Sequence, residues 1–365
     1  MTNIYRDVQN SPQIKSTEID GRSIGPGHPC FVIAEAGVNH NGNVENAKKL
    51  IDIAVTSKAD AVKFQTFNTD LLAIPDAPKA EYQTITTDGE ESQTDMLRQL
   101  ELPREAFAEL QHYCESQNII FLSSPFDEPS VDLLYNLDVP AYKIPSGEAI
   151  NLPLLKHIGS KQKPIILSTG MSYLEEIHTA VNTIFETGNH DIMLLHCTSN
   201  YPAAPADINL NAMETLRNYF SLPVGFSDHT TGIEIPLAAV AMGACIIEKH
   251  FTLDKTLTGP DHRASLEPEE LKNLIIAIRN IELSFGNGIK APAASELSNR
   301  NIIRKSIYLK TSKNAGEVLI ESDLVSMRPA GGIYPSEIPN IIGKRLVKSL
   351  SQGAMLTWDD VTCEK

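Results

Sequence analysis

Short apolar runs alternate with amphipathic stretches along the chain from residue 30 to about residue 285. Runs that are nearly continuous in Val, Ile, Leu and Phe are typical of parallel strands buried on both faces. The amphipathic stretches between them predict helices that cover such a sheet. Eight runs carry the pattern, at 31–37, 61–67, 119–126, 141–147, 164–170, 192–199, 224–230 and 245–252. Eight strand–helix repeats predict closure into a (β/α)8 TIM barrel, with a doubly wound open sheet as the alternative.

Segments outside this pattern predict a hairpin, a linker and a second domain. An Asp-Gly pair lies between short alternating segments at 16–24, as in a tight hairpin ahead of the first barrel strand. Residues 286–299 are rich in Gly, Ala, Ser and Pro, which is typical of a linker. We therefore expect a barrel domain over 1–285 and a small β-clip domain over 300–365.

The second domain contains a faint internal repeat with a spacing of 37 residues. A repeat of this kind predicts two related β-rich halves, with short strands at Ser306–Leu309 and Arg345–Val347. The repeated positions are Gly316, Leu319, Asp323 and Leu324, which recur as Gly353, Leu356, Asp360 and Val361.

Composition places the chain among globular proteins and argues against nucleic acid as its main partner. Hydrophobic residues make up 42% of the chain and charged residues 21%, which is ordinary for a protein with a sizeable core. The formal net charge is −15, whereas phosphate-backbone binding draws on clustered Lys and Arg. Residues 300–365 hold ten Lys or Arg and seven Asp or Glu, a net charge of +3, which leaves −18 for residues 1–299.

The cysteines and the apolar segments predict a cytoplasmic protein without a membrane partner. The start, MTNIYRDVQNSPQ, has no apolar core for a signal peptide, and the longest mostly apolar run, 235–247, is too short for a membrane span. An odd, sparse set of cysteines without a C-x-x-C pair is typical of reduced thiols. The set is Cys30, Cys114, Cys197, Cys245 and Cys363.

Polar side chains stand at the end of every predicted barrel strand. In a (β/α)8 barrel the carboxyl ends of the strands face one shared pocket, so these side chains predict a functional site. They are Glu35; Lys63 and Gln65; Ser123 and Ser124; Lys143, Ser146 and Glu148; Ser168 and Thr169; His196, Thr198 and Ser199; Ser227, Asp228 and His229; Glu248 and His250. The connection over 68–102 is long, and long barrel loops usually belong to the active-site face.

His229 and His250 lie near the ends of adjacent predicted strands. Neighbouring strands are about 4.8 Å apart, so two imidazoles can reach one cation at about 2.1 Å. Taken singly, each histidine reads as a packed core residue or a general base. The pair favours a metal, and two visible nitrogens fit an open site for Mn²⁺ or Mg²⁺ better than a closed thiolate zinc site.

Lys63 and Lys143 lie inside strands that should be buried, where an ammonium needs an anionic partner. One explanation is salt bridges to Glu35 or Glu148. The other is a bound phosphate and carboxylate, the two groups of phosphoenolpyruvate, and a Schiff-base lysine is a third. Hydroxyls that would assist anion binding are those of Ser146, Ser168, Ser199 and Ser227.

Eight ordered motifs give the chain a family resemblance. IAEAGVNHNG, AVKFQT, AYKIPSGE, ILSTGM, LHCTSNYP, GFSDHT, EKHFT and GPDH follow one another as in the sialic acid synthases, whose proteins end in an SAF (antifreeze-like) domain. The resemblance implies condensation of phosphoenolpyruvate with N-acetylmannosamine, giving N-acetylneuraminate and phosphate by C–O cleavage. The alternative that it implies is the same chemistry on a 2,4-diacetamido-trideoxyhexose, giving legionaminate or pseudaminate.

The resemblance also implies roles for individual residues. His229 and His250 would hold a divalent metal, Mn²⁺ preferred and Mg²⁺ or Co²⁺ possible, beside the sugar aldehyde that C3 of phosphoenolpyruvate attacks. Glu35 is the implied proton-handling group. Positions matching phosphoenolpyruvate contacts are Lys63, Lys143, Ser146, Ser168 and Ser227, and those matching sugar contacts are Gln65, Phe126, Glu148, Tyr201 and Asp261. Arg328 matches an arginine that reaches from the tail of one subunit into the barrel of another and contacts the N-acyl group of the sugar, which implies a domain-swapped homodimer.

Three points remain open from the sequence. Ser199 stands where some family members have Asn, so its contact with phosphoenolpyruvate follows only from its place at a strand end. A class I aldolase using Lys63 or Lys143 is a different enzyme on the same barrel. A carbohydrate- or ice-binding tail on an inactive barrel is the non-enzymatic alternative, which the polar strand ends disfavour.

Overall fold

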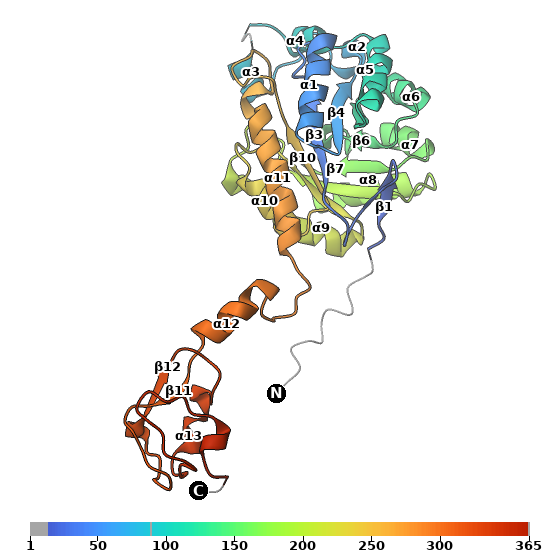
Figure 1. Cartoon of the computed structure of the whole chain (residues 1–365). Coiled ribbons are helices and arrows are strands. Elements are labelled where there is room, and N and C mark those ends of the chain that lie inside the picture. The colour runs from blue at the N-terminus through green and yellow to red at the C-terminus, as the bar shows by residue number, and fades with distance from the viewer. Residues whose placement is uncertain (1–13, 88–89, 364–365) are drawn as a thin grey trace. The chain divides into compact units, whose positions relative to one another are not determined.

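The computed structural model describes residues 14–87 and 90–363. The N-terminal segment MTNIYRDVQNSPQ is residues 1–13 and lies outside the described residues. The chain divides into two compact units, 1–285 and 286–365 (Figure 1). None of the helices in the two described ranges is long and apolar enough to cross a bilayer.

Eight parallel strands form the first unit's sheet, in the order β5-β4-β3-β10-β9-β8-β7-β6. The two ends of this order, β5 and β6, lie side by side without a hydrogen-bonded ladder, so the barrel is nearly closed. The predicted barrel is therefore confirmed, and the open doubly wound sheet is wrong. The strands are β3 (Phe31–Gly37), β4 (Ala61–Thr66), β5 (Ile120–Pro125), β6 (Tyr142–Ile144), β7 (Ile165–Ser168), β8 (Ile192–Cys197), β9 (Val224–Asp228) and β10 (Ile246–His250).

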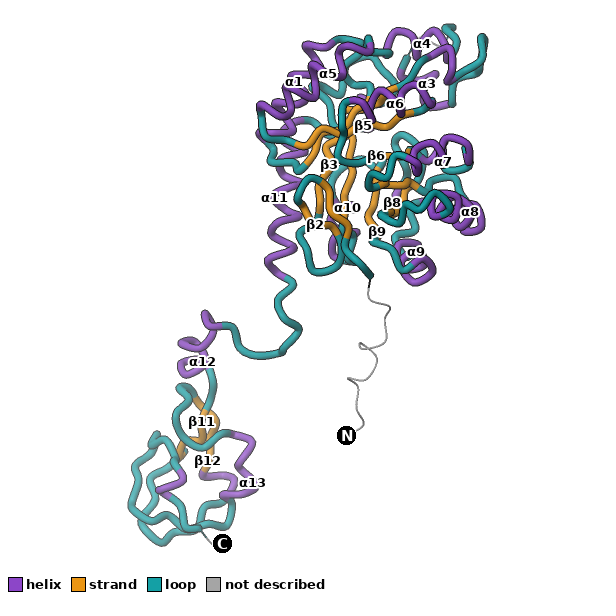
Figure 2. The backbone as a smooth tube through the Cα atoms, turned by 90° about the vertical axis from the view of Figure 1, so that its right-hand side faces the viewer, coloured by secondary structure: helices purple, strands orange, loops and turns teal. Residues whose placement is uncertain are grey.

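Helices surround the strands, with α1 and α11 outside one wall and α7, α8 and α9 outside the opposite one (Figure 2). Their starts follow local chemistry, because Asn43 accepts from the Asn46 backbone N–H at the head of α1 and Pro268 opens α11. The barrel helices are α1 (Val44–Thr56), α5 (Arg104–Ser116), α6 (Glu128–Asn136), α7 (Leu152–Ser160), α8 (Leu174–Phe185), α9 (Ala212–Phe220), α10 (Glu234–Ala241) and α11 (Pro268–Ser284). The long 68–102 connection forms α2 (Thr69–Leu72), α3 (Glu81–Thr86) and α4 (Gln93–Leu100).

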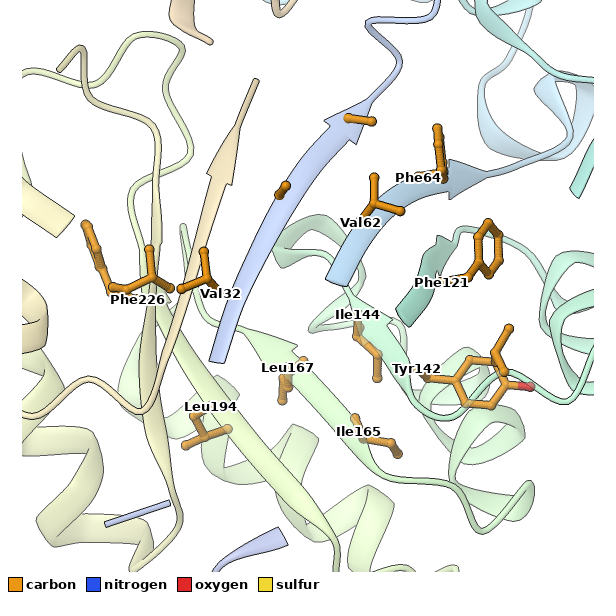
Figure 3. Packing of buried hydrophobic residues seen from close by; sticks show 14 of the residues in the cluster. Val32, Val62, Phe64, Phe121, Tyr142, Ile144, Ile165, Leu167, Leu194 and Phe226 are labelled. Atoms are coloured by element: carbon orange, nitrogen blue, oxygen red, sulfur yellow. The ribbon is translucent and has the colours of Figure 1, made fainter. Parts of the chain in front are cut away.

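Alternation along each strand separates two apolar layers. Outward side chains such as Phe64, Leu167 and Phe226 pack between strands and helices (Figure 3). Inward side chains in the lower part of the barrel form a second cluster, which Ile19 and Ile24 join. Those two residues belong to the antiparallel hairpin of β1 (Thr17–Ile19) and β2 (Arg22–Ile24), at the place where the sequence predicts one. The barrel interior is thus closed by apolar side chains at its amino end.

The second unit is built from two halves that repeat each other. The Leu309 N–H donates to the Ala354 carbonyl, and 37 residues later the Leu346 N–H donates to the Glu317 carbonyl, so each half bonds the other reciprocally. Asp323 and Asp360 each accept from the backbone N–H three residues earlier. The predicted repeat is confirmed.

The elements of the second unit differ from expectation in two places. The regular elements are α12 (Leu297–Ile303), β11 (Ser306–Leu309), β12 (Leu324–Met327) and α13 (Ile338–Ile341). Arg345–Val347 forms isolated bridges rather than a strand, because its partners Val318 and Val361 come from two different segments. The segment 286–299 is not wholly irregular, since α12 begins inside it.

Candidate active site

The carboxyl ends of the barrel strands open on one cavity of about 440 Å³. Most of the site residues expected from the sequence line it. They are Glu35, Lys63, Gln65, Phe126, Lys143, Ser146, Ser168, Ser199, Tyr201, Ser227, His229, His250 and Asp261. A cavity of this size fits two small polar substrates better than a macromolecular ligand.

Strand alternation decides which strand-end side chains reach this cavity. On β10, Glu248 and His250 point inward and Lys249 outward, and on β9 Ser227 points inward and Asp228 outward. Several polar residues that the sequence placed in the shared pocket are therefore not among its lining residues. These are Ser123, Glu148, Thr169, His196, Thr198 and Asp228.

Two lysines and two glutamates form a buried charge cluster in the cavity. Lys63 Nζ lies 2.8 Å from Glu35 Oε2 and 3.7 Å from Glu248 Oε2, and Lys143 Nζ lies 3.3 Å from Glu248 Oε1. All four side chains are at most 4% exposed. The expected pairing with Glu35 is present. Pairing with Glu148 is wrong, because that carboxylate accepts from Asn151 Nδ2 at 2.7 Å and does not line the cavity.

Burial and neighbouring charges shift the pKa values of the two carboxylates in opposite directions. Burial raises the pKa of Glu35 to about 7, although Lys63 opposes the shift. Burial acts in the same direction on Glu248, but attraction by Lys143 and Lys63 outweighs it and lowers its pKa. Glu248 is therefore the fixed anion of the cluster, and Glu35 can gain or lose a proton near neutral pH.

Hydroxyl groups converge on the part of the cavity next to the lysines. Ser146 Oγ accepts from the Gly170 N–H at 2.9 Å, and Ser227 Oγ donates to Glu248 at 2.9 Å. The buried Ser168 Oγ has no hydrogen-bond partner among the described residues. Buried hydroxyls are nearly always paired, so Ser168 is available to a ligand. Gly170 keeps this region open, because a Cβ there would lie 2.3 Å from Ser199 Oγ.

His229 and His250 face the same cavity with ring centroids 5.5 Å apart. His229 Nδ1 donates to the Thr198 carbonyl at 2.7 Å, which leaves Nε2 with a free lone pair. Nδ1 of His250 is buried without a hydrogen-bond partner among the described residues, and lies 3.7 Å from Asp261 Oδ2. Burial lowers the pKa of His229 to about 4 and that of His250 well below its usual value. Both rings are neutral at pH 7.

This pair fits an open metal site rather than a closed one. Neutral imidazoles are the form that binds a cation, and an orienting carbonyl behind one ring is a common outer-shell feature of metal-binding histidines. Within the described part of the chain, no group of three or more His, Cys, Asp and Glu is placed to hold a metal. A metal at His229 and His250 would therefore take its remaining ligands from water and substrate oxygens.

The 68–102 connection supplies the other side of the cavity. Tyr82 from α3 lies against Tyr201, with ring centroids 5.1 Å apart, and Tyr201 in turn lies 4.1 Å from the ring of His229. Apolar side chains of the same connection continue this wall, together with amides. Its lining members are Leu72, Ala80, Tyr82, Gln83, Gln93, Met96, Leu97 and Leu100. The sequence pointed to this loop but gave no periodicity that could single out these residues.

Two predicted sugar contacts differ in their surroundings. Asp261 is buried in the cavity wall beside His250, and burial raises its pKa to about 6. Arg328 belongs to the second unit, where it is exposed next to the Gly-rich segment 330–332. Its role in sugar binding therefore stays a prediction.

Comparison with known proteins agrees with this geometry. The NeuB family model matches residues 50–290, and the SAF domain model matches residues 304–362. The N,N'-diacetyllegionaminic acid synthase of Legionella pneumophila is 49% identical over 341 residues, which cover 92% of this chain and 96% of that protein. The protein of the same name from Campylobacter jejuni is 50% identical over 328 residues, or 89% and 98% of the two chains.

A solved structure of similar architecture comes from Leptospira borgpetersenii. It is an N-acetylneuraminic acid (sialic acid) synthetase in complex with citrate, with a TM-score of 0.69 and 36% sequence identity. The match covers 78% of this chain and 95% of that one.

Proposed function

The chain belongs to the NeuB family, and from this premise we propose that it condenses phosphoenolpyruvate with a 2,4-diacetamido-2,4,6-trideoxyhexose to give N,N'-diacetyllegionaminate and phosphate. The two relatives that are about half identical to this chain carry the legionaminate name, whereas the N-acetylneuraminate enzyme of similar structure is 36% identical. These comparisons favour the legionaminate alternative over N-acetylmannosamine, which remains the second candidate.

The observation that carries the proposal is the buried charge cluster beside the unpaired hydroxyl of Ser168. Phosphoenolpyruvate has a phosphate and a carboxylate, and Lys63 and Lys143 are cations within one small cavity. Charge-assisted hydrogen bonds from two ammonium groups and nearby serines suit these two anions. A Schiff base at Lys63 is less well supported, because attraction by Glu248 and Glu35 outweighs burial and raises the pKa of Lys63. Burial lowers the pKa of Lys143, so borohydride trapping decides for that residue.

The apolar wall supports the choice of sugar. A 2,4-diacetamido-6-deoxy sugar has a C6 methyl and two acetyl methyls, whereas N-acetylmannosamine has hydroxyls at C4 and C6. Leu72, Met96 and Leu97 line the cavity and pack with Val38 and Phe67. Apolar side chains favour methyl groups and leave sugar hydroxyls without partners.

The proposal assigns a divalent metal, Mn²⁺ or else Mg²⁺ or Co²⁺, to His229 and His250. When bound, such an ion supplies Lewis-acid polarisation of the sugar aldehyde. The support is the chemistry of the two side chains, which are neutral, face one cavity and include an unpaired nitrogen. The proposal assigns Asp261, which lies beside His250, to a sugar hydroxyl.

The proposed reaction balances with Glu35 as the proton acceptor. C3 of phosphoenolpyruvate forms a bond to the aldehyde carbon, whose oxygen is left as an alkoxide. Water then adds at C2 and loses one proton to the Glu35 carboxylate, which returns a proton to the alkoxide and makes it a hydroxyl. Cleavage of the C2–O bond to phosphate leaves the 2-keto acid, and the proton of the C2 hydroxyl goes to the departing phosphate. Lys63 and Lys143 hold the phosphate and carboxylate throughout, which keeps C3 facing the sugar.

The proposal also includes a domain-swapped homodimer in the cytoplasm. Arg328 is exposed on a unit whose residues 300–365 sum to +3, while the rest of the chain sums to −18, so opposite charges favour contact between the tail of one copy and the barrel of another. All five cysteines are free thiols, which suits a reducing compartment.

The test is to incubate the purified protein with phosphoenolpyruvate, Mn²⁺ and a panel of acylated amino sugars. Phosphate release and product mass are followed together. We expect turnover with the 2,4-diacetamido-6-deoxy sugar and a smaller kcat/KM with N-acetylmannosamine. A preference for N-acetylmannosamine would select the second candidate. No phosphate release with any sugar, or borohydride trapping of a lysine adduct, would contradict the proposed chemistry.

A further inference from the structure

A buried ion pair joins β9 and β10 on the face opposite the cavity. Lys249 Nζ lies 2.5 Å from Asp228 Oδ2, and both side chains are fully buried. The two residues are direct partners in the ladder between the strands. They point outward, into the layer under the helices, and neither lines the cavity.

The pair is part of a closed hydrogen-bonded ring around the end of β9. The Thr230 N–H donates to Asp228 Oδ1 at 3.0 Å, and the Thr230 hydroxyl donates to Asp228 Oδ2 at 3.1 Å. Lys249 Nζ also donates to the Thr230 carbonyl. The residue enclosed between Asp228 and Thr230 is His229. The backbone on both sides of this imidazole is therefore fixed to β10.

The same pair stands directly before the second histidine. Lys249 precedes His250 just as Asp228 precedes His229, and alternation turns both histidines to the cavity side. The Asp228–Lys249 contact on the outer face is therefore formed by the two residues that directly precede the inward-facing histidines. The contact therefore links the two backbone positions that precede the rings.

Stability alone does not account for the pair. Two charges without solvent contact lose their hydration, and apolar residues of similar volume commonly give an equal or greater stability. Most outward positions of these strands are indeed apolar, as at Phe226 and Ile247. What an ion pair adds over apolar packing is a fixed geometry between two strands.

We infer that Asp228 and Lys249 are positioning residues, which hold His229 and His250 at the separation that a divalent cation requires. This inference rests on the metal site proposed above. Neither residue touches substrate or metal. Their effect passes through the backbone at the ends of β9 and β10 to the two rings, as outer-shell residues tune the metal ligands that they orient.

The test uses the double variant Asp228→Asn/Lys249→Met in the full-length protein. The Asn amide oxygen still accepts from the Thr230 N–H, while the interstrand charge pair is removed without leaving one charge unpaired. Thermal unfolding and Mn²⁺ binding by calorimetry and by the electron spin resonance of free Mn²⁺ are compared with the wild type. We expect a similar Tm and an Mn²⁺ Kd that is at least about tenfold higher.

A matched control separates positioning from general loss of an ion pair. Asp60 and Arg279 form another pair, 2.8 Å apart, between the loop before β4 and helix α11. Asp60→Asn/Arg279→Met should change the Tm without changing the Mn²⁺ Kd. The Kd for phosphoenolpyruvate in the absence of metal should change much less than the Mn²⁺ Kd in the Asp228→Asn/Lys249→Met variant, because Lys63 and Lys143 lie on β4 and β6.

The outcomes are distinct. A folded double variant with wild-type Mn²⁺ affinity overturns the inference. Should that variant fail to fold, Lys249→Arg decides, since it keeps the charge but moves the donor nitrogens, and wild-type Mn²⁺ affinity in this variant overturns the inference equally. A wild-type protein that binds no Mn²⁺ shows instead that the proposed metal site is wrong.

Discussion

Glu35 and Lys63 are partners in the ladder between β3 and β4, and their side chains meet inside the barrel with Lys63 Nζ 2.8 Å from Glu35 Oε2. Burial raises the pKa of Glu35 to about 7 and outweighs the attraction of this cation, and the negative charge of Glu248 adds to the rise. A carboxyl group that titrates near neutral pH beside a bound anion can exchange a proton during the reaction.

This relationship predicts the pH dependence of the reaction. The carboxylate of Glu35 is the form that accepts a proton, and it is lost as the pH falls through about 7. We expect kcat/KM for phosphoenolpyruvate, which reports the free enzyme, to fall about tenfold per pH unit below that value. Glu35→Gln should lower kcat by about 10²–10⁴-fold and remove the fall of kcat/KM at low pH. A flat profile in the wild-type protein between pH 5.5 and pH 8 would contradict the assignment.

Gly170 offers a test of the phosphoenolpyruvate side of the cavity. A Cβ at this position would lie 2.3 Å from Ser199 Oγ, 2.8 Å from Ser146 Oγ and 2.9 Å from Cys197 Sγ. Gly170→Ala must therefore displace the hydroxyls that converge there, and we expect KM for phosphoenolpyruvate to rise by about tenfold or more. Steady-state kinetics measure the change.

Gly147 is the matched control for that variant. It also lines the cavity and lies next to Ser146, but a Cβ there would meet nothing within 4 Å. Gly147→Ala should leave KM for phosphoenolpyruvate unchanged. Equal effects of the two substitutions would argue against crowding of the serines as the cause.

Removal of the two histidines tests the metal site. Without one imidazole, only one protein nitrogen remains for the ion, so His229→Ala and His250→Ala should each abolish Mn²⁺-dependent turnover while the far-ultraviolet circular dichroism stays that of the wild type. A chelator should abolish activity of the wild type, and added Mn²⁺ should restore it. His112→Ala is the control, because this side chain is 86% exposed on α5. Substantial activity in either cavity variant would disprove the ligand assignment.

The barrel was readable from the sequence because strand periodicity and strand ends are local features. The eight runs and the polar residue at each end predict that Glu35, Lys63, Lys143 and His250 share one pocket, and all four line the cavity. The prediction was wrong where a polar side chain at a strand end points away from the barrel interior. Asp228 belongs to the outward set because side chains alternate along a strand, and the strand boundary that fixes the phase was not known to the nearest residue.

The partners of the lysines could not be read in the same way. Glu148 is five residues from Lys143 in the sequence, but the backbone turns into a short 3-10 helix after Pro145 and carries the carboxylate out of the cavity. Glu248 is about one hundred residues away and meets Lys143 only because the barrel closes. The place of Tyr82 in the cavity wall could not be predicted either. The 68–102 connection has no regular spacing of hydrophobic residues, and its path depends on contacts such as the one between Tyr82 and Tyr201.

Leu97 tests which sugar the cavity takes. Its side chain is half-buried in α4, lines the cavity and packs with Phe67 and Met96. Leu97→Asn keeps the approximate volume but replaces a methyl contact with an amide, so kcat/KM for the 2,4-diacetamido-6-deoxy sugar should fall by about 10–200-fold. KM for phosphoenolpyruvate should not change, because Lys63 and Lys143 contact Glu35, Glu248 and Ser124 rather than α4.

The same variant distinguishes the two candidate sugars. An amide can hydrogen-bond a sugar hydroxyl, so Leu97→Asn should leave kcat/KM for N-acetylmannosamine unchanged or raise it, which shifts the ratio of the two values toward that sugar. Leu71→Asn is the matched control, since Leu71 is 58% exposed in the same connection and does not line the cavity. A loss of equal size for both sugars would mean that Leu97 supports the fold of α4 rather than contact with the C6 or acetyl methyls. Leu72 and Met96 also line this wall, so in that case they would be the residues to test for sugar specificity. The proposed binding of phosphoenolpyruvate would not be affected by that result.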